Sequence, residues 1–206
     1  MTNWEKEKER FEKIGLITND VPMDVLHYLK SNDKKTKMNN KLVGHIKKEY
    51  AYLNIPPYVS NFFLSNIDLN HPYTAGLLKK YKVMTQDKTF TLASLWVNYQ
   101  KKHEFNPFHN HAGIFSFIVF LKIPYDLSKE EKKFPDTNSR GYASKLAFYL
   151  TDSVGDIGEE LISVDKSFEG KMVMFPAKMN HIVYPFYTSN DYRITVSGNI
   201  LFDVGV

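Results

Sequence analysis

The run GIFSFIVFLKI, residues 113–123, contains the longest apolar stretch of the chain, broken only by Ser116 and Lys122. It is too short to cross a bilayer, which takes about 20 apolar residues. Its β-branched and aromatic residues are typical of a β-strand. We therefore expect a strand here and no membrane-spanning segment.

Similar short stretches flank this run on both sides. Residues 89–100 are rich in Thr, Phe, Trp, Val and Tyr, and Gly, Pro, Asn and Asp separate the later stretches. Further strands are expected at residues 146–150, 161–164, 171–175, 181–186 and 193–202. Several short strands with turn residues between them predict a β-sandwich or barrel. The charged stretch 126–140 is expected to be an exposed insertion.

The first 80 or so residues are expected to be mostly helical. Helices are expected over residues 4–14, from residue 20 through 29, from about residue 40 to 53, and over residues 76–84. Pro56 and Pro57 are expected to end the third helix. We therefore expect a single domain, residues 1–206, in which residues 1–88 form a mostly helical support and residues 89–206 form the β-core.

The composition excludes several kinds of site. The chain has 206 residues, seven His and no Cys. Without cysteine there is no disulfide, zinc finger, iron–sulfur cluster or thiol nucleophile, so nitrogen and oxygen must hold any metal. The net charge is +4, and only three of the 27 basic residues are arginines, which disfavours a nucleic-acid-binding surface. No apolar leader is visible, and we expect a cytoplasmic protein.

Two histidines, His109 and His111, stand two residues apart just before the central run. On an extended chain, side chains two residues apart point to the same face, so both imidazoles would lie on one side. Two ligands on one strand cannot surround an ion, and a metal site needs a third ligand from elsewhere. Taken alone, such a pair is more often an ordinary pair of polar residues.

The last strand alternates in polarity. Its apolar side presents Tyr192, Ile194 and Val196, and its polar side presents Arg193, Thr195, Ser197 and Asn199. The polar side faces either solvent or the mouth of a barrel. In the second case, one of the three arginines lies on the wall of that mouth, with a hydroxyl two residues later on the same side.

These residues together resemble a known family. The ordered set is W-x-N at 96–98, N-P-x-H-x-H at 106–111, F-P at 175–176, His181, and R-I-T-x-x-x-N at 193–199. It is similar to the Fe(II)- and 2-oxoglutarate-dependent oxygenases, and most similar to a branch common in marine phages and bacteria. The resemblance covers about residues 94–203. It implies a mainly β fold, in which N-terminal helices precede a double-stranded β-helix, a cupin-like jelly roll.

The resemblance also implies roles for the matched residues. His109 and His181 correspond to the two iron-binding histidines. Arg193 corresponds to the arginine that pairs with the far carboxylate of 2-oxoglutarate, and Thr195 to the hydroxyl residue that assists it. An arginine suits this role because its planar fork meets a carboxylate with two hydrogen bonds. Two further candidates for contacts with the cosubstrate or the substrate lie one strand earlier: Asn98 and Tyr99.

The chain departs from the larger family at His111, where an Asp or Glu usually completes the iron site. The branch that it resembles has the same H-x-H pattern. We therefore expect His109, His111 and His181 to form the metal-binding and catalytic centre. Glu104 is an alternative group that would complete the coordination sphere in place of His111.

The resemblance implies a dioxygenase that uses Fe(II), 2-oxoglutarate and dioxygen, a hydroxylase of a protein side chain or a small molecule. Two other interpretations stay open. One is a three-His cupin-type dioxygenase without 2-oxoglutarate, in which Arg193 binds a substrate carboxylate. The other is a non-catalytic jelly-roll module with a binding or structural role. No nucleic-acid or membrane partner is expected, and a homodimer is left open.

Overall fold

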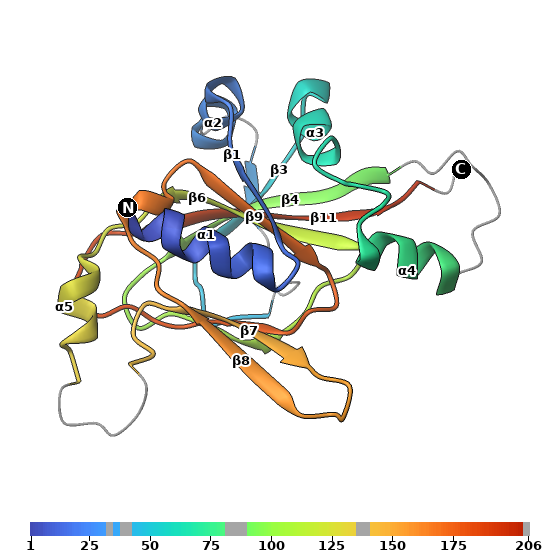
Figure 1. Ribbon diagram of the computed structural model, residues 1–206. Coiled ribbons are helices and arrows are strands. Elements are labelled where there is room, and N and C mark those ends of the chain that lie inside the picture. The colour runs from blue at the N-terminus through green and yellow to red at the C-terminus, as the bar shows by residue number, and fades with distance from the viewer. Residues whose placement is uncertain (32–34, 38–42, 81–89, 135–140, 204–206) are drawn as a thin grey trace.

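The computed structural model describes residues 1–31, 35–37, 43–80, 90–134 and 141–203, and their strands form two antiparallel sheets (Figure 1). The seven-stranded sheet has the order β1 (Ile17–Asp20), β9 (Lys171–Pro176), β6 (Phe115–Lys122), β11 (Arg193–Phe202), β4 (Phe90–Gln100), β3 (Glu49–Tyr52) and β2 (Lys35–Lys37). The four-stranded sheet has the order β5 (Asn106–His109), β10 (His181–Val183), β7 (Leu146–Thr151) and β8 (Ile157–Ile162).

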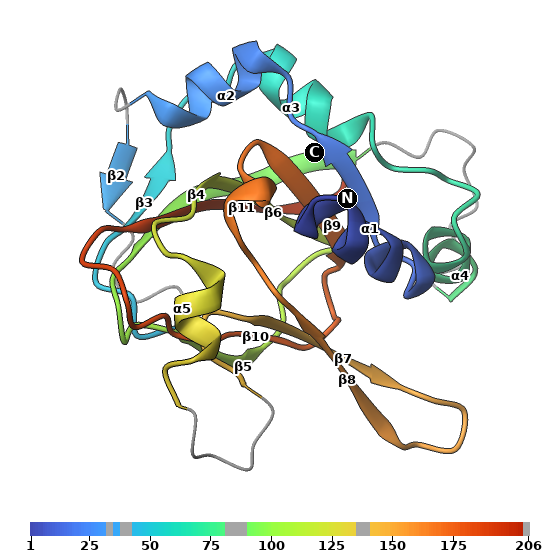
Figure 2. The ribbon, with the colours of Figure 1, turned by 60° about the vertical axis from the view of Figure 1, so that its left-hand side comes forward.

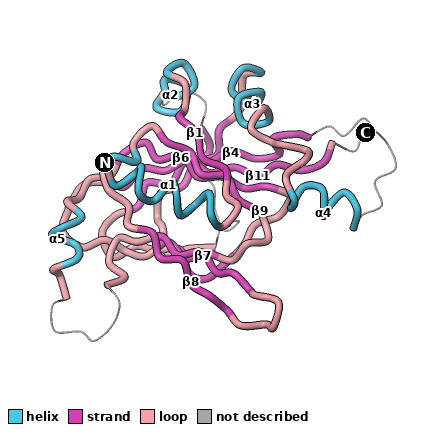
Figure 3. The backbone as a smooth tube through the Cα atoms, in the orientation of Figure 1, coloured by secondary structure: helices cyan, strands magenta, loops and turns pink. Residues whose placement is uncertain are grey.

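The helices lie at the periphery of the two sheets (Figure 3). They are α1 (Asn3–Lys13), α2 (Met23–Lys30), α3 (Pro57–Leu64), α4 (Pro72–Lys80), α5 (Leu127–Glu131) and the 3₁₀ turn η1 (Lys166–Phe168). The helices α2 and α3 cover the outer face of the large sheet (Figure 2), and α1 closes one side of the space between the sheets. None of the described helices has the length and apolar character needed to span a membrane.

Strand β6 lies at the centre of the large sheet, between β9 and β11, and is buried on both faces. On the outer face, Phe117 stacks on Phe63 of α3 with ring centroids 4.0 Å apart. On the inner face, Ile118 and Phe120 pack in a cluster that also contains Phe148 of the small sheet. Because both faces are covered, apolar residues occupy both faces of the strand instead of alternating with polar ones, and only Ser116 and Lys122 interrupt them. The strand expected at residues 113–123 is confirmed as Phe115–Lys122.

The eight strands from β4 to β11 place the two sheets face to face as a jelly roll. Their chain order passes from one sheet to the other at each connection, except for the hairpin between β7 and β8. The predicted fold class, mainly β with N-terminal helices, is confirmed. The part before residue 89 is less helical than expected, because β1, β2 and β3 extend the large sheet at both edges.

The helix expected from about residue 40 to 53 is wrong. Residues 38–42 lie outside the described residues, and Glu49–Tyr52 form strand β3 between β2 and β4. The apolar spacing that suggested a helix also fits a strand: Tyr52 faces the outer core while Glu49 faces the other side. Pro57 does not end a helix but begins α3, where a proline needs no hydrogen-bond donor.

Three other boundaries differ from the expectations. The helix expected at 76–84 corresponds to α4, Pro72–Lys80, and residues 81–89 lie outside the described residues. The strand expected at 161–164 begins earlier, as Ile157–Ile162. The insertion at 126–140 contains the short helix α5, capped by the Asp126 side chain, which accepts a hydrogen bond from Ser128 N–H; residues 135–140 are outside the described part.

Gly198 in β11 is a position where the fold tolerates no side chain. A Cβ there would lie 2.4 Å from Cζ of Phe117 and 2.8 Å from the Ser94 carbonyl oxygen. We expect Gly198→Ala to lower the free energy of unfolding by about 3 kcal/mol, because neither the core ring nor the sheet backbone has room to move. The measurement is urea unfolding.

The matched control is Gly76→Ala on α4, where a Cβ meets nothing within 4 Å. It should raise stability by roughly 0.5–1 kcal/mol, and equal losses in both variants would refute the packing argument.

Candidate active site

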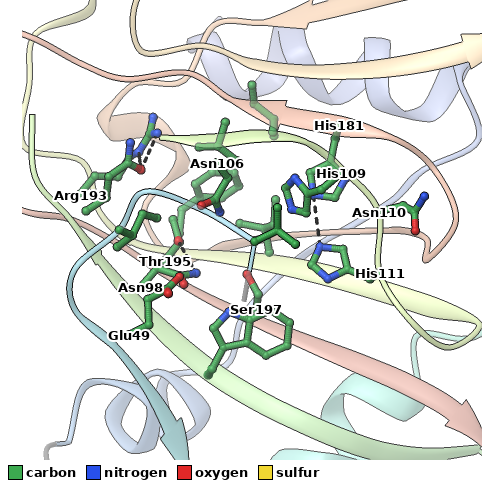
Figure 4. A pocket seen from close by; sticks show the side chains of 18 of the residues that line it. Glu49, Asn98, Asn106, His109, Asn110, His111, His181, Arg193, Thr195 and Ser197 are labelled. Atoms are coloured by element: carbon green, nitrogen blue, oxygen red, sulfur yellow. Dashed lines mark hydrogen bonds between the residues drawn. The ribbon is translucent and has the colours of Figure 1, made fainter. Parts of the chain in front are cut away.

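Three histidines from the small sheet and the loop after β5 converge in space. His109 on β5 and His181 on β10 are directly opposite each other in the antiparallel register. His111 lies two residues after His109, and its Nε2 lies 3.3 Å from Nε2 of His181. One potential ligand atom from each residue falls within a group no more than 4.8 Å across (Figure 4). The structure thus brings together the three histidines that the sequence singled out.

The backbone fixes the orientation of two of these rings. Nδ1 of His109 lies 2.6 Å from the Pro107 carbonyl oxygen, and Nδ1 of His181 lies 3.1 Å from the Met179 carbonyl oxygen. A ring that donates its Nδ1–H to a carbonyl keeps the lone pair on Nε2 free. This is how protein carbonyls usually orient metal-binding imidazoles.

The cluster is electrostatically suited to a cation. Burial lowers the pKa of all three imidazoles: that of His111 to about 4, with His109 and Lys178 contributing, and that of His181 well below its ordinary value. The rings are therefore neutral at pH 7, the form that coordinates a metal. Among the described residues no carboxylate joins the cluster. Glu104 is not part of it, and its Oε2 accepts a hydrogen bond from the Lys101 N–H at 2.9 Å.

The histidines line a cavity of about 210 Å³ between the two sheets. Its polar floor comes from the inward faces of β4 and β11 and consists of Asn98, Gln100, Arg193, Thr195, Ser197 and Asn199. Apolar side chains complete the wall: Ile118, Phe120, Leu146 and Val183. The polar face of the last strand is therefore the wall of an internal cavity and not a solvated surface.

Several polar groups in this cavity have no partner within the described part of the protein. The buried side-chain oxygens of Asn98, Asn106 and Asn199 accept no hydrogen bond there. Nδ2 of Asn98 donates to Oγ1 of Thr195 at 3.4 Å. Buried polar atoms are nearly always hydrogen-bonded, and unpaired ones facing a cavity indicate a site for a polar ligand.

Arg193 is buried, with 3% of its surface exposed, and binds neutral acceptors only. Its Nε and Nη2 donate to Oε1 of Gln100 at 2.9 and 2.7 Å, and Nη2 also donates to the Tyr184 carbonyl at 2.9 Å. Nη1 donates to the Ser144 carbonyl at 3.0 Å and to the Tyr125 hydroxyl at 3.3 Å. No described carboxylate forms an ion pair with it. A buried cation without a counter-charge favours the binding of an anion in the cavity it lines.

A comparison with known families matches this half of the chain. The family described as "Putative 2OG-Fe(II) oxygenase" matches residues 94–199, just over half of the chain, from β4 to β11. The chain belongs to this family of 2-oxoglutarate- and Fe(II)-dependent oxygenases. The family assignment made from the sequence is thereby confirmed, and the finer branch common in marine phages and bacteria stays a prediction.

Solved structures are similar to this oxygenase in fold. A 2OG-Fe(II) oxygenase family protein from Burkholderia pseudomallei is 9% identical, with a TM-score of 0.51 over 94% of this chain and 88% of its own. A prolyl-4-hydroxylase from Pseudomonas putida is 12% identical, with a TM-score of 0.49 over 94% and 95% of the two chains. A viral collagen prolyl hydroxylase from Paramecium Bursaria Chlorella virus-1 is 12% identical, with a TM-score of 0.43 over 90% and 95%. No curated protein matches the sequence.

The residues of this oxygenase fit the two groups that its family uses. Three neutral imidazoles are suitable ligands for Fe(II). The buried Arg193 guanidinium and the unpartnered amide oxygens offer charge and hydrogen-bonding capacity to a polar anion such as 2-oxoglutarate. Thr195 lines the same wall of the cavity as Asn98 and Arg193.

Tyr99 is a second candidate, besides Glu104, that the structure does not bring to the cavity. It follows Asn98 on β4, and successive side chains of a strand point to opposite faces. Its ring lies on the outer face of the sheet, 5.9 Å from the Tyr50 ring and 6.0 Å from the Tyr192 ring. Asn98 and Tyr99 are consecutive residues of a strand, and only one of the two can face inward.

The cavity also contains residues that the sequence analysis missed. Glu49 on β3 lies directly opposite Asn98, is 7% exposed and lines the cavity. Burial raises the pKa of its carboxyl to about 7, with the nearby Glu104 carboxylate adding to the effect. Asn106 and Gln100 also line it. Gln100 could have been found from the sequence, because it lies two residues after Asn98 in the predicted strand 89–100 and therefore faces the same side. Glu49 could not, because its segment was expected to be helical.

The raised pKa of Glu49 implies a pH-dependent cost of folding. Between the ordinary pKa of 4.5 and about 7, the folded protein binds more protons here than the unfolded chain, so stability falls as the pH rises through this window. We expect Glu49→Gln to be more stable than the wild type at pH 8 by up to about 3 kcal/mol and equally stable near pH 4.5. Urea unfolding at the two pH values measures this.

The control for this variant is Glu9→Gln on the exposed face of α1, which should be as stable as the wild type at both pH values. A Glu49→Gln variant that is less stable than the wild type at pH 8 would mean that the ionised carboxylate makes a favourable interaction inside the folded protein.

Proposed function

We propose that this oxygenase binds Fe(II) through His109, His111 and His181 and 2-oxoglutarate through Arg193, and that it hydroxylates a protein side chain or a small molecule. The observation that carries the proposal is the convergence of three neutral imidazoles on a cavity that also holds a buried, uncompensated guanidinium. The lone pairs of neutral imidazoles favour a metal cation, and a buried guanidinium without a counter-charge favours an anion.

When bound, Fe(II) supplies the reaction with dioxygen that couples decarboxylation of 2-oxoglutarate to hydroxylation of the substrate. The protein supplies ligation, orientation and shielding. The Pro107 and Met179 carbonyls hold the rings of His109 and His181 so that their Nε2 atoms face the cluster. Apolar side chains, among them Ile118 and Phe120, exclude water from the reacting centre.

Gln100 has a specific part in cosubstrate binding under this proposal. Its Oε1 accepts two of the five hydrogen bonds that Arg193 donates, and the residue lines the cavity. A carboxylate that reaches Arg193 therefore replaces a neutral amide oxygen with a charged one, and charge-assisted hydrogen bonds are roughly twice as strong as neutral ones. Thr195 and Asn98 line the same wall and would hydrogen-bond to the cosubstrate beside it.

The test is an anaerobic titration of the Fe(II)-loaded protein with 2-oxoglutarate, followed by visible absorbance. We expect a charge-transfer band that saturates with one equivalent of 2-oxoglutarate, and succinate release when dioxygen is admitted with a substrate. Stoichiometric Fe(II) without the band or any binding of 2-oxoglutarate would instead support a three-His dioxygenase that uses no cosubstrate. A protein that retains no metal would support the non-catalytic module.

A further inference from the structure

The cavity has a second charged group that the proposed function does not use. Glu49 is more than nine-tenths buried, and its side chain lies on the cavity wall beside Asn98 (Figure 4). Within the described part of the chain, no lysine or arginine forms an ion pair with it and no donor forms a hydrogen bond to it. An ionised carboxylate in this position costs free energy unless a ligand compensates its charge.

Two polar atoms in the cavity with Glu49 are acceptors that no described donor satisfies. The buried Oδ1 atoms of Asn98 and Asn106 line the same cavity without a donor from the described residues. The charged group that acts on Glu49 is a second carboxylate, Glu104. The Gln100 amide in the same cavity donates to the Glu104 carbonyl oxygen, and Arg193 forms no ion pair with Glu49. A ligand that carries a positive charge and donors of its own would therefore satisfy Glu49 and these two acceptors.

The local backbone holds these acceptors in place. The segment that leads into Glu49 passes closely over the start of β5, where a Cβ on Gly44 would lie 2.1 Å from Oδ1 of Asn106. The following residue, His45, donates its N–H to the Phe105 carbonyl at 2.9 Å and stacks on the Phe105 ring at 4.8 Å. The close approach of Gly44 and the His45–Phe105 contacts thus hold the segment before β3 against the start of β5, which carries Asn106.

We propose that Glu49, together with the amide oxygens of Asn98 and Asn106, binds a protonated alkylamine of the substrate that this oxygenase hydroxylates. An ammonium carries one positive charge and three donors, which match one carboxylate and two unpartnered acceptors. Arg193 then binds the anionic cosubstrate, and Glu49 binds the cationic substrate in the same cavity. The ammonium belongs either to a free amino acid or to a lysine side chain of a peptide.

This inference rests on the proposed function, and the experiment separates the two. The holoenzyme with Fe(II) and 2-oxoglutarate is prepared anaerobically, and the charge-transfer band is recorded before any amine is added. Absence of the band in the wild-type enzyme overturns the proposed function. With the band present, n-butylamine and its uncharged counterpart 1-butanol are titrated, and the change in the band reports binding next to the metal.

We expect n-butylamine to perturb the band at concentrations about 10- to 100-fold lower than 1-butanol, because hydrogen bonds to charged groups are stronger than neutral ones. Glu49→Gln should abolish this preference, and the exposed control Asp68→Asn should keep it. Equal binding of amine and alcohol by the wild-type enzyme overturns the inference without recourse to any variant. A Glu49→Gln enzyme that has lost the band before amine is added assigns Glu49 to the cosubstrate instead, which also overturns it.

The source of the ammonium is identified by succinate formation with dioxygen. Free L-lysine and L-ornithine form one arm, and an N-acetylated peptide with a single lysine forms the other. We expect succinate formation with the substrates of one arm. We expect this succinate formation to stop when the amine of that substrate is acetylated. Turnover that survives acetylation of the amine in either arm would show that the ammonium is not the group recognised.

Discussion

His181→Ala is expected to reduce the affinity for Fe(II) by more than about 100-fold and to abolish succinate formation. Loss of a group that merely orients a ligand typically costs 10- to 100-fold in metal affinity, and removal of a ligand itself should cost more. His181 lies opposite His109 and within hydrogen-bonding distance of His111, so its loss leaves two ligands that cannot surround an ion. Iron content after dialysis and the charge-transfer band measure the effect.

The matched control is His27→Ala on the exposed side of α2, which should retain full iron content and activity. A His181→Ala protein with wild-type iron content would show that the metal is held elsewhere. Circular dichroism of both variants tests whether the fold is preserved, since His181 is almost fully buried.

Arg193→Lys is expected to weaken 2-oxoglutarate binding by about 10- to 100-fold and to lower the free energy of unfolding by about 3 kcal/mol. A lysine keeps the charge but has three donors at one point, whereas Arg193 makes five hydrogen bonds from a planar fork. At least two hydrogen bonds from a charged donor are lost, at about 1.5–3 kcal/mol each. Titration of the band gives the affinity, and urea unfolding gives the stability.

Arg10→Lys is the control for this variant. Arg10 also donates from its guanidinium to several acceptors, among them Glu7 and Glu160, but it lies on α1, away from the cavity, and its side chain is 34% exposed. It should lose at most about 1 kcal/mol of stability and bind 2-oxoglutarate normally. If Arg193→Lys binds 2-oxoglutarate as tightly as the wild type, Arg193 has a structural role and is not the partner of the carboxylate.

The sequence was most informative where the physics is local. The apolar run at 113–123 predicts β6 because its β-branched and aromatic residues favour a strand, and the structure shows that both faces of this strand are covered. The two-residue spacing of His109 and His111 predicts that both point to one side, and the convergence with His181 agrees with this. Tyr99 shows the opposite case, because the alternation that brings Asn98 inward must direct the next residue outward.

The features that could not be predicted from the sequence depend on pairing between strands that are distant in the chain. Glu49 enters the cavity because β3 pairs with β4, a contact between positions 49 and 98 that no local pattern reports. Its segment has apolar residues at a spacing that also suits a helix, and only the edge of the sheet decides between the two. The bonding of Arg193 to Gln100 is likewise a contact across paired strands, visible only when the register of β11 on β4 is known.

His109 lies on β5, so a metal bound to this residue would also hold the strand in place. Strand β5 has four residues and lies at an edge of the small sheet, where β10 is its one strand partner among the described residues. A cation that binds both His109 and His181 cross-links these two strands at the residues where they pair. If the proposed site binds a metal, we expect β5 to fray in the apo protein and its amide hydrogen exchange to slow when the metal binds.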